Sequence, residues 1–464
     1  MLNKRLPLLV DSHAHLDGNQ FAHDLDETIE RATANGISHI LTIGCDLESS
    51  SKSIAIAEKY ENIFAAVGVH PHDATEINDS VLAKLHVMLT HPKVVALGEI
   101  GLDYYRDRSP REIQRRAFRE QIRLAKEIGK PIIVHDRDAH VEVVQILKEE
   151  NASAVGGILH CFSGDLNMAQ QCLDLGFYLS FTGTITYPKN DAVREIIKEI
   201  PIDRMLVETD CPYLSPQKFR GKRNEPAYVR YTAEKMAQIK GLSIRDIGRV
   251  TSRNCHDLFG FGSVDQSSKI AYQIRDSLYL NITNRCTNSC IFCAKFSNFV
   301  VKGHELHLDH EPSVAEIKQV IGDPTHYAEI VFCGYGEPLL RLDIIKEISQ
   351  WLKNQGVTVR INSDGQANLV HGRNILPELA GLIDAISISL NAPNSEDYHR
   401  LCRSTYGAQK SYQAVKKFLQ QAGQFIPDVT ATAVSYPGVD IASCEQVAKE
   451  LGVTFRVREY NEVG

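Results

Sequence analysis

Residues 6–15 read LPLLVDSHAH, a short apolar run that passes directly into two histidines, His13 and His15. An undiluted apolar run of this length is typical of a strand that is buried on both faces of a sheet. Seven more runs of this kind follow, and helical stretches separate most of them. They lie at residues 39–44, 63–69, 94–100, 131–136, 156–161, 177–183 and 205–210. Eight buried strands alternating with helices predict a parallel (β/α)8 barrel of the TIM type.

The helical stretches carry end signals, and a polar segment marks the end of this half. The stretch REIQRRAFREQIRLAKEIG (111–129) stops on a glycine, as helices often do. Two more helices are predicted near 226–241 and 243–258, where they would close the barrel. A Gly- and Ser-rich stretch, FGFGSVDQSSK, follows them. We therefore expect a first domain at residues 1–262 and a linker at 263–274.

Residues 275–464 show the same alternation with fewer strands. The predicted strands lie at residues 277–283, 328–334, 357–363, 385–391, 428–435 and 454–460. Six βα units are too few to close a ring of eight, so we expect an open, partial (β/α)6 barrel. The predicted fold class is α/β, with one complete and one partial barrel.

Composition places the chain among ordinary globular proteins. It has 464 residues, of which 43% are hydrophobic and 23% charged, and no apolar run reaches 18 residues. The N-terminal stretch lacks a small-residue cleavage site, so we interpret it as a strand and not as a signal peptide. Eleven cysteines without a secretion signal favour a reducing, cytoplasmic setting over a disulfide framework. A net charge of −7 argues against a generic basic nucleic-acid binder, although bound metal ions could still attract a phosphate substrate.

Six side chains of metal-ligand type are predicted at the carboxyl ends of these strands, which is the end where barrel enzymes build their sites. They are His13, His15, Glu99, His135, His160 and Asp210. An HxH pair in a strand points both rings the same way, so both can reach one ion. Imidazoles together with carboxylates suit Zn, Mn, Fe or, with more oxygen ligands, Mg. A carboxylate with ligands on both sides could bridge two ions.

Seven motifs occur in order along this half: DSHAHLD, GVHPHD, GEIGLDYY, PIIVHDRD, LHCFSGD, VETDCPYL and RNEP. With them, residues 6–262 closely resemble the TatD family of metal-dependent DNases. The resemblance implies two divalent ions (Mg, Mn or Zn) and hydrolysis of a phosphodiester in nucleic acid, often as 3′-end trimming. The first ion would be bound by His13, His15 and Asp210. The second would be held by His135 and His160, with Glu99 as the bridge between the two.

The same resemblance suggests residues for catalysis and substrate contact. Asp210 would take the proton of the attacking water, beside the bridging Glu99. His70 and His72 match the VHPHD motif, and each could touch substrate or support the ligands by hydrogen bonding. The loop KFRGKRNEP (218–226) follows the eighth strand, so its basic residues, Arg223 among them, could meet phosphates.

Three cysteines follow the first strand of the second half, in the segment NRCTNSCIFC. Cys286, Cys290 and Cys293 leave a fourth ligand position open. A Cys₃His zinc site is one interpretation, since His304, His307 and His310 follow closely. The next strand, however, ends in CGYGEP (333–338), and this combination closely resembles the radical S-adenosylmethionine enzymes.

That second resemblance covers residues 275–464 and implies a cofactor for the three thiols. Cys286, Cys290 and Cys293 would bind three irons of a [4Fe–4S] cluster, and the fourth iron would bind S-adenosylmethionine. An external electron donor would be needed. The residues expected to contact S-adenosylmethionine are Gly334, Gly336 and Glu337 after the second strand, Asn362 after the third, and Ser389 after the fourth.

The fusion resembles TatD-linked radical S-adenosylmethionine proteins, so we expect a bifunctional enzyme. Its hydrolase half would act on nucleic acid or another phosphoester, and its radical half on an unknown, possibly nucleotide-related substrate. Two alternatives stay open. A two-ion centre could equally serve an aminoacyl-ester deacylase or an amidohydrolase. The metals and the cluster could also belong to a sensing or binding module without catalysis.

Overall fold

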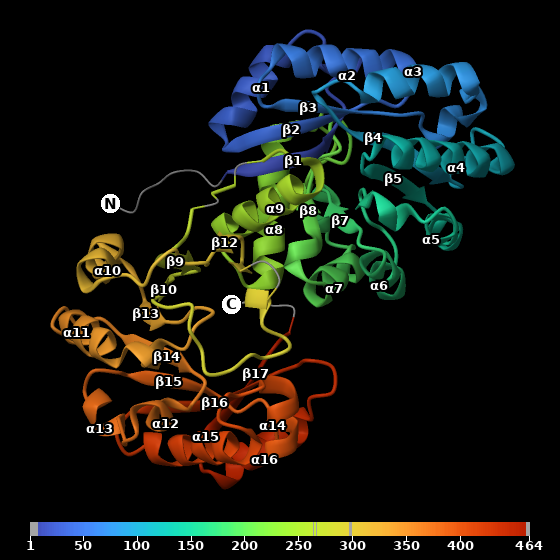
Figure 1. The fold of residues 1–464 in the computed structure, drawn as a ribbon. Coiled ribbons are helices and arrows are strands. Elements are labelled where there is room, and N and C mark those ends of the chain that lie inside the picture. The colour runs from blue at the N-terminus through green and yellow to red at the C-terminus, as the bar shows by residue number, and fades with distance from the viewer. Residues whose placement is uncertain (1–7, 263, 266, 297–298, 461–464) are drawn as a thin grey trace. The chain divides into compact units, whose positions relative to one another are not determined.

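The computed structural model describes residues 8–262, 264–265, 267–296 and 299–460 (Figure 1). The chain folds as two compact units, the first ending at Val264 and the second beginning at Asp265. Each unit is built on one large, mainly parallel sheet. In the part of the chain that the structure describes, no helix is both long and apolar enough to cross a bilayer.

The sheet of the first unit has eight parallel strands that pair in chain order. They are β1 (Leu9–Ala14), β2 (Ile37–Ile43), β3 (Ile63–Val67), β4 (Val94–Asp103), β5 (Ile132–Arg137), β6 (Gly157–Leu159), β7 (Tyr178–Phe181) and β8 (Met205–Val207). A parallel bridge between Ala14 and Cys211 joins the first strand to the segment after the last. This bridge closes the ring, and the predicted (β/α)8 barrel is confirmed.

Nine α-helices of this unit surround the strands or close the barrel. They are α1 (Leu25–Ala34), α2 (Leu47–Lys59), α3 (Asp79–Leu89), α4 (Arg111–Ile128), α5 (His140–Glu149), α6 (Leu166–Asp174), α7 (Asp191–Glu199), α8 (Val229–Lys240) and α9 (Ile244–Phe259), counted within the described residues. Local signals set their ends. Gly129 ends α4 in the left-handed region at φ 73°, and the Asp46 side chain accepts from the Ser49 amide at the start of α2.

The strands are buried on both faces. On the outer face, Leu97 and Val134 belong to the same hydrophobic core as Phe118 and Ile122 of α4. On the inner face, small and branched strand residues pack with Phe259 at the end of α9. Two-sided burial explains why these strands are continuous apolar runs without alternating polar residues.

The second unit contains an open sheet of seven strands in the order β17-β16-β15-β14-β13-β10-β9. Its members are β9 (Ala271–Ile274), β10 (Ser277–Leu280), β13 (Glu329–Phe332), β14 (Val359–Ser363), β15 (Ala385–Ser389), β16 (Asp428–Val434) and β17 (Thr454–Arg458). The six strands from β10 to β17 are parallel, as predicted. Strand β9 was not predicted: it lies in the range assigned to the linker and pairs antiparallel with β10.

Helices and one small hairpin complete the second unit. The helices are α10 (Val314–Ile321), α11 (Leu342–Lys353), α12 (Ala367–His371), α13 (Leu376–Leu379), α14 (Ser395–Cys402), α15 (Ala408–Ala422) and α16 (Ile441–Glu450). The hairpin consists of β11 (Val300–Val301) and β12 (His304–Glu305). Strand residues such as Ile361 and Ile386 pack in one core with helix residues such as Ile345 and Val415.

Two expected strand ends differ from the structure. Glu99 was expected at the end of its strand, but β4 continues to Asp103. An irregularity in the β4–β5 pairing between Leu97 and Ile100 accompanies this change, and Glu99 lies within it. Strand β8 ends at Val207, so Asp210 lies three residues beyond it, in the segment that pairs with β1.

Candidate functional site

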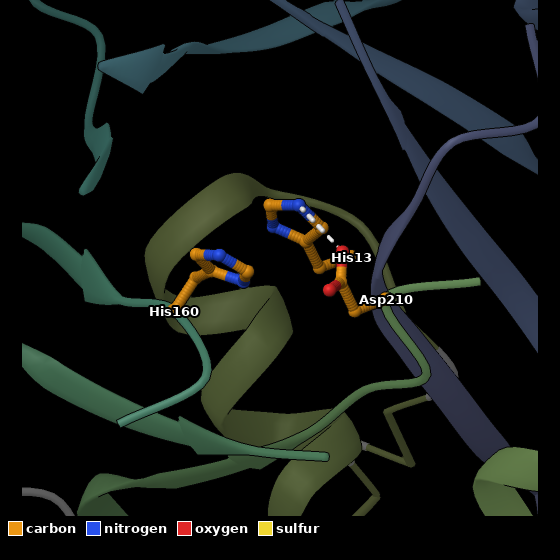
Figure 2. Close-up of side chains that lie close together, drawn as sticks. All are labelled: His13, His160 and Asp210. Carbon is orange, nitrogen blue, oxygen red and sulfur yellow. Dashed lines mark ion pairs between the residues drawn. The ribbon is translucent and has the colours of Figure 1, made fainter. Parts of the chain in front are cut away.

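The seam between β1 and the segment after β8 brings three predicted ligands together. The Asp210 amide donates to the His13 carbonyl at 2.9 Å, which holds the two segments in register. Asp210 Oδ1 lies 3.7 Å from His13 Nε2 and 3.3 Å from His15 Nε2. Figure 2 shows His13 and Asp210 with His160, whose ring stacks on that of His13 at a centroid distance of 3.9 Å.

Glu99 is buried and lies between two sets of imidazoles. Its Oε2 is 3.5 Å from His13 Nε2 and 3.6 Å from His15 Nε2. Its Oε1 is 2.6 Å from His135 Nδ1 and 3.1 Å from His160 Nε2. Each carboxylate oxygen therefore faces a different pair of histidines, which is the geometry that a bridging ligand requires.

The charges of this cluster depend on one another. Burial opposes ionisation of Glu99, but the charges of His160 and His70, with hydrogen bonds from His13 and His135, hold its pKa well below the usual value. Burial and the neighbouring His160 lower the pKa of His13. A neutral imidazole has a free lone pair, so His13 is in the form that binds metal.

Three carboxylates that the sequence analysis did not single out support the ligands. Glu208 lies 3.2 Å from His160 Nδ1, and Asp103 lies 3.4 Å from His135 Nε2. Asp11 accepts from the Thr209 amide at 2.8 Å and ties β1 to the segment that leads to Asp210. Such carboxylates orient ligating histidines. Their sequence signal was an acidic residue close to a ligand within the VETD, GLDYY and DSHAH motifs.

The residues that were predicted to contact substrate have different surroundings. His70 Nε2 lies 3.7 Å from Glu99 Oε1, so His70 belongs to the ligand cluster. His72 Nε2 lies 2.8 Å from Asp103, which in turn lies 3.4 Å from His135, so His72 contacts the cluster through Asp103. Arg223 is ion-paired with Asp24 at 2.6 Å, so its guanidinium is engaged away from the cluster.

The donor set fits divalent metal ions. The site contains three groups of residues, and within each group the ligand atoms lie within 4.8 Å of one another. The groups are His13, His160 and Asp210; His13, His15 and Glu99; and His70, Glu99 and His135. Each group combines imidazole nitrogen with carboxylate oxygen, as Zn and Mn sites do. His13 Nδ1 is buried and has no hydrogen-bond partner among the described residues.

The three cysteines of the second unit lie in a loop that begins after β10. Backbone hydrogen bonds from Ser289 to the Cys402 carbonyl and from Ile291 to the Leu401 carbonyl, both 2.9 Å, fix the loop to the end of α14. Cys286, Cys290 and Cys293 are partly exposed free thiols. Cys286 Sγ accepts from the Asn288 amide at 3.4 Å, and Cys402 and Cys444 are buried.

The three loop thiols are not among the compact ligand groups that the described residues form. Zn–S bonds of about 2.3 Å would place three sulfur atoms about 4 Å apart. In the ranges that the structure describes, no ligand group within 4.8 Å includes a loop cysteine. The nearby histidines have other contacts: His304 bonds to the Gln273 carbonyl and His310 to Glu316.

A second buried carboxylate lies beside the cysteine loop. Glu337 accepts from the amides of Leu339 (3.0 Å) and Asp364 (2.6 Å). Burial and the charge of Asp364 raise the pKa of Glu337 well above its usual value. Among the described residues neither Glu337 nor Asp364 has an ion-pair partner, so the pair would accept an external cation such as an ammonium group.

Asn362 and Ser389 lie on the sheet face opposite the helices. The side-chain amide oxygen of Asn362, Oδ1, accepts a hydrogen bond from Arg360 Nη1 at 2.9 Å, so this side chain already has a partner. Ser363, its neighbour, donates to Glu337 at 3.0 Å and belongs to the Glu337 site instead. Period-2 alternation separates these two adjacent residues onto opposite faces of β14.

Comparisons with known proteins match each unit to a family. The family model for TatD-related DNases matches residues 10–260, more than half of the chain. The chain belongs to the TatD-related DNase family. The model for the radical S-adenosylmethionine superfamily matches residues 280–451, so the second unit carries a radical S-adenosylmethionine domain. Membership in these two families implies divalent metal ions, an iron–sulfur cluster and S-adenosylmethionine as cofactors.

Several relatives share the TatD-type unit. The metal-dependent hydrolase YabD of Bacillus subtilis is 48% identical over 252 residues, which are 54% of this chain and 99% of YabD. The 3′-5′ ssDNA/RNA exonuclease TatD of Cronobacter sakazakii is 38% identical over 256 residues, 54% of this chain and 97% of the relative. The crystal structure of the TatD homologue YJJV from Escherichia coli matches with a TM-score of 0.52 and 31% identity, over 55% of this chain and 98% of YJJV.

Gly336 allows the Glu337 segment to pack closely against the backbone that leads into the cysteine loop. A Cβ at position 336 would lie 2.0 Å from the Thr283 carbonyl oxygen and 2.7 Å from that of Arg285. Because backbone must move to accommodate it, we expect Gly336→Ala to destabilise the second unit by about 1–3 kcal/mol. Thermal unfolding of this unit should shift downward, and iron bound after anaerobic reconstitution should decrease.

Gly423→Ala is the matched control, because a Cβ there meets nothing within 4 Å and the backbone has φ −62°. It should leave both iron content and unfolding temperature unchanged. If Gly336→Ala behaved like this control, the close packing of the two segments would not matter for cluster binding.

Proposed function

We propose that the TatD-type unit hydrolyses phosphodiester bonds of single-stranded nucleic acid with two divalent ions. The observation that carries the proposal is the position of Glu99, whose two oxygens face separate sets of histidines. His13, His15 and Asp210 would hold one ion, and His135 and His160 the other. Glu99 would bridge them.

The residues of the chain would divide the work as follows. When bound, the ions lower the pKa of a water molecule and neutralise charge on the phosphoryl oxygens. Asp210 would accept the proton of that water. Burial opposes its ionisation, but the hydrogen bond from His15 and the charges of His160 and His13 hold its pKa below the usual value. Asp210 is therefore an ionised base at neutral pH.

Exposed aromatic rings beside the cluster favour nucleic acid over a small ester. Tyr213 is 56% exposed, and its ring lies 6.1 Å from that of His15. Tyr105 is 58% exposed and has the Arg137 guanidinium 4.2 Å from its ring centroid. Arg137 is two residues from His135 on β5. Aromatic and arginine planes of this kind stack the bases of single strands.

The hydrolase assignment is tested anaerobically with defined single-stranded DNA, RNA and tRNA in Mg²⁺ or Mn²⁺. Mass spectrometry should show strands shortened by whole nucleotides. His135→Ala removes a ligand, so we expect the rate to fall by about 10- to 100-fold or more. His86→Ala, a histidine half-exposed on α3 and paired with Glu127, is the matched control and should retain activity.

The products distinguish the alternatives. Intact strands that lose only an acyl group would replace the nuclease assignment with that of a deacylase. Strands that stay unchanged in every metal would contradict nucleic acid as the substrate.

A separate prediction concerns the stacking residue Tyr105. Stacking on an aromatic ring contributes about 1–3 kcal/mol per base, so Tyr105→Leu should lower kcat/KM for a single-stranded oligonucleotide by about 5- to 150-fold. An oligonucleotide whose terminal nucleotides lack bases has nothing to stack and serves as the control. The variant should cleave it as fast as the native protein does. Equal losses on both substrates would show that Tyr105 acts on the ions or the fold instead.

We propose that the second unit binds a [4Fe–4S] cluster through Cys286, Cys290 and Cys293, with S-adenosylmethionine at the fourth iron. Together these cofactors supply a 5′-deoxyadenosyl radical. Glu337 would accept hydrogen bonds from the ammonium group of S-adenosylmethionine. Its lack of any cation partner among the described residues supports this role. Gly334 and Gly336 bring its segment close to the residues that lead into the cysteine loop. Asn362 and Ser389 would make further contacts with S-adenosylmethionine.

Glu337→Gln tests this role. A hydrogen bond to a charged group contributes about 1.5–3 kcal/mol, so the affinity for S-adenosylmethionine should fall by about 10- to 150-fold. Iron content should not change. Glu347→Gln, on the exposed face of α11, is the control and should bind S-adenosylmethionine normally. Unchanged affinity in Glu337→Gln would remove this residue from the binding site.

A further inference from the structure

One face of the open sheet is mainly polar across β14, β15 and β16. Side chains alternate between faces along a strand, and on β14 to β16 the apolar members, such as Ile361 and Ile388, pack in the core with the helices. The alternate positions carry hydroxyl and amide groups. They are Asn362, Ser387, Ser389, Thr430 and Thr432. Such a face can donate several hydrogen bonds to a bound molecule.

Three arginines share this polar face. Arg360 extends from β14, and Arg456 and Arg458 extend from β17 at the edge of the sheet. Arg456 Nη2 lies 3.2 Å from Ser387 Oγ, although β16 separates their strands. Arg456 and Arg458 are both exposed, and the contact with Ser387 carries the Arg456 side chain toward β15 across the face of the sheet.

Only one of these positive charges has a matching carboxylate. Arg360 forms two hydrogen bonds with Glu329, at 3.0 and 2.6 Å. Within the described part of the chain, neither Arg456 nor Arg458 has a carboxylate within ion-pair distance. Burial and repulsion from Arg360 and Arg458 lower the pKa of Arg456, while Asp428 attracts it only weakly. Among the described residues, these two exposed guanidinium groups have no carboxylate partner, and one bound anion could contact both.

This positive region lies beside the cysteine loop. The ring of Phe292, next to Cys293 in sequence, lies 5.7 Å from that of Tyr436, and Tyr436 lies 4.8 Å from Tyr460, just after β17. An anion on the arginines would therefore lie near the expected cluster.

We propose that Arg456 and Arg458 bind an anionic group, a phosphate or carboxylate, of the substrate of the radical domain. The Ser387 and Thr432 hydroxyls lie on the same face and complete the site. This inference rests on the proposed radical function, since it assigns the chemical class of the molecule that the radical would attack. The carboxylate of S-adenosylmethionine has the same chemistry, so the experiment must separate the two sources.

The test uses the full chain with its cluster reconstituted anaerobically, and pyrophosphate as the probe. Equilibrium dialysis should show that the double variant Arg456→Gln/Arg458→Gln binds pyrophosphate at this site at least about tenfold more weakly than the native protein. The double variant Arg456→Lys/Arg458→Lys keeps the charges and should retain most of the binding. The control is Arg373→Gln/Lys410→Gln, which removes two positive charges elsewhere in the same unit. It should bind like the native protein, and any pyrophosphate held by the hydrolase centre is common to all four proteins.

The second arm of the test measures binding of S-adenosylmethionine. Binding is detected by the change that it causes in the electron paramagnetic resonance spectrum of the reduced cluster. We expect the same change in native protein and Arg456→Gln/Arg458→Gln. A parallel loss of S-adenosylmethionine binding would assign the arginines to that cofactor and overturn the proposal. Equal pyrophosphate binding in all four proteins would also overturn it. A native protein that binds no S-adenosylmethionine would refute the radical function itself, and this outcome is distinct from both others.

Discussion

A carboxylate buried among imidazoles sets the electrostatics of the first unit. Glu99 stays ionised in a buried position because histidines on both sides stabilise its charge, and they in turn depend on it. Removing it would leave several buried nitrogens without their anionic partner. The surrounding strands therefore have to place histidines on both sides of the Glu99 carboxylate. The pairing irregularity in β4 that contains Glu99 contributes to this placement.

The inner face of the sheet differs between the two units, because the first sheet closes into a barrel and the second stays open. The closed barrel fills its inner face largely with apolar side chains, and the buried histidines and carboxylates of the candidate site gather toward the carboxyl ends of its strands. The open sheet cannot fill its inner face in this way, and it carries hydroxyls, amides and arginines there. The hydrolase centre is thus a rim of ligands, whereas the radical domain offers a whole polar surface beside its cofactor loop.

Much of this arrangement could be predicted from the sequence, because strand-end histidines and the cysteine spacing are local patterns. Alternating apolar runs were enough for both sheets and their order. Glu208 and Asp103 were missed because their roles depend on contacts with His160 and His135, which are far away in the sequence. Strand β9 was missed because its residues have mixed polarity, and its pairing with β10 decides its structure. Arg223 has its ion-pair partner Asp24 199 residues away, which its local basic surroundings did not indicate, and its contact with substrate stays a prediction.

The hydrogen bond from the Asp210 amide to His13 joins two residues that are nearly two hundred positions apart. A ribosome must therefore synthesise almost the whole barrel before the first ion could find its complete set of ligands. Early parts of the nascent chain expose isolated histidines with low affinity, and tight binding begins only when the ring closes. If His13 and Asp210 hold an ion as proposed, metal uptake would be a late event of synthesis, and the bound ion would hold the first and last strands together against unfolding.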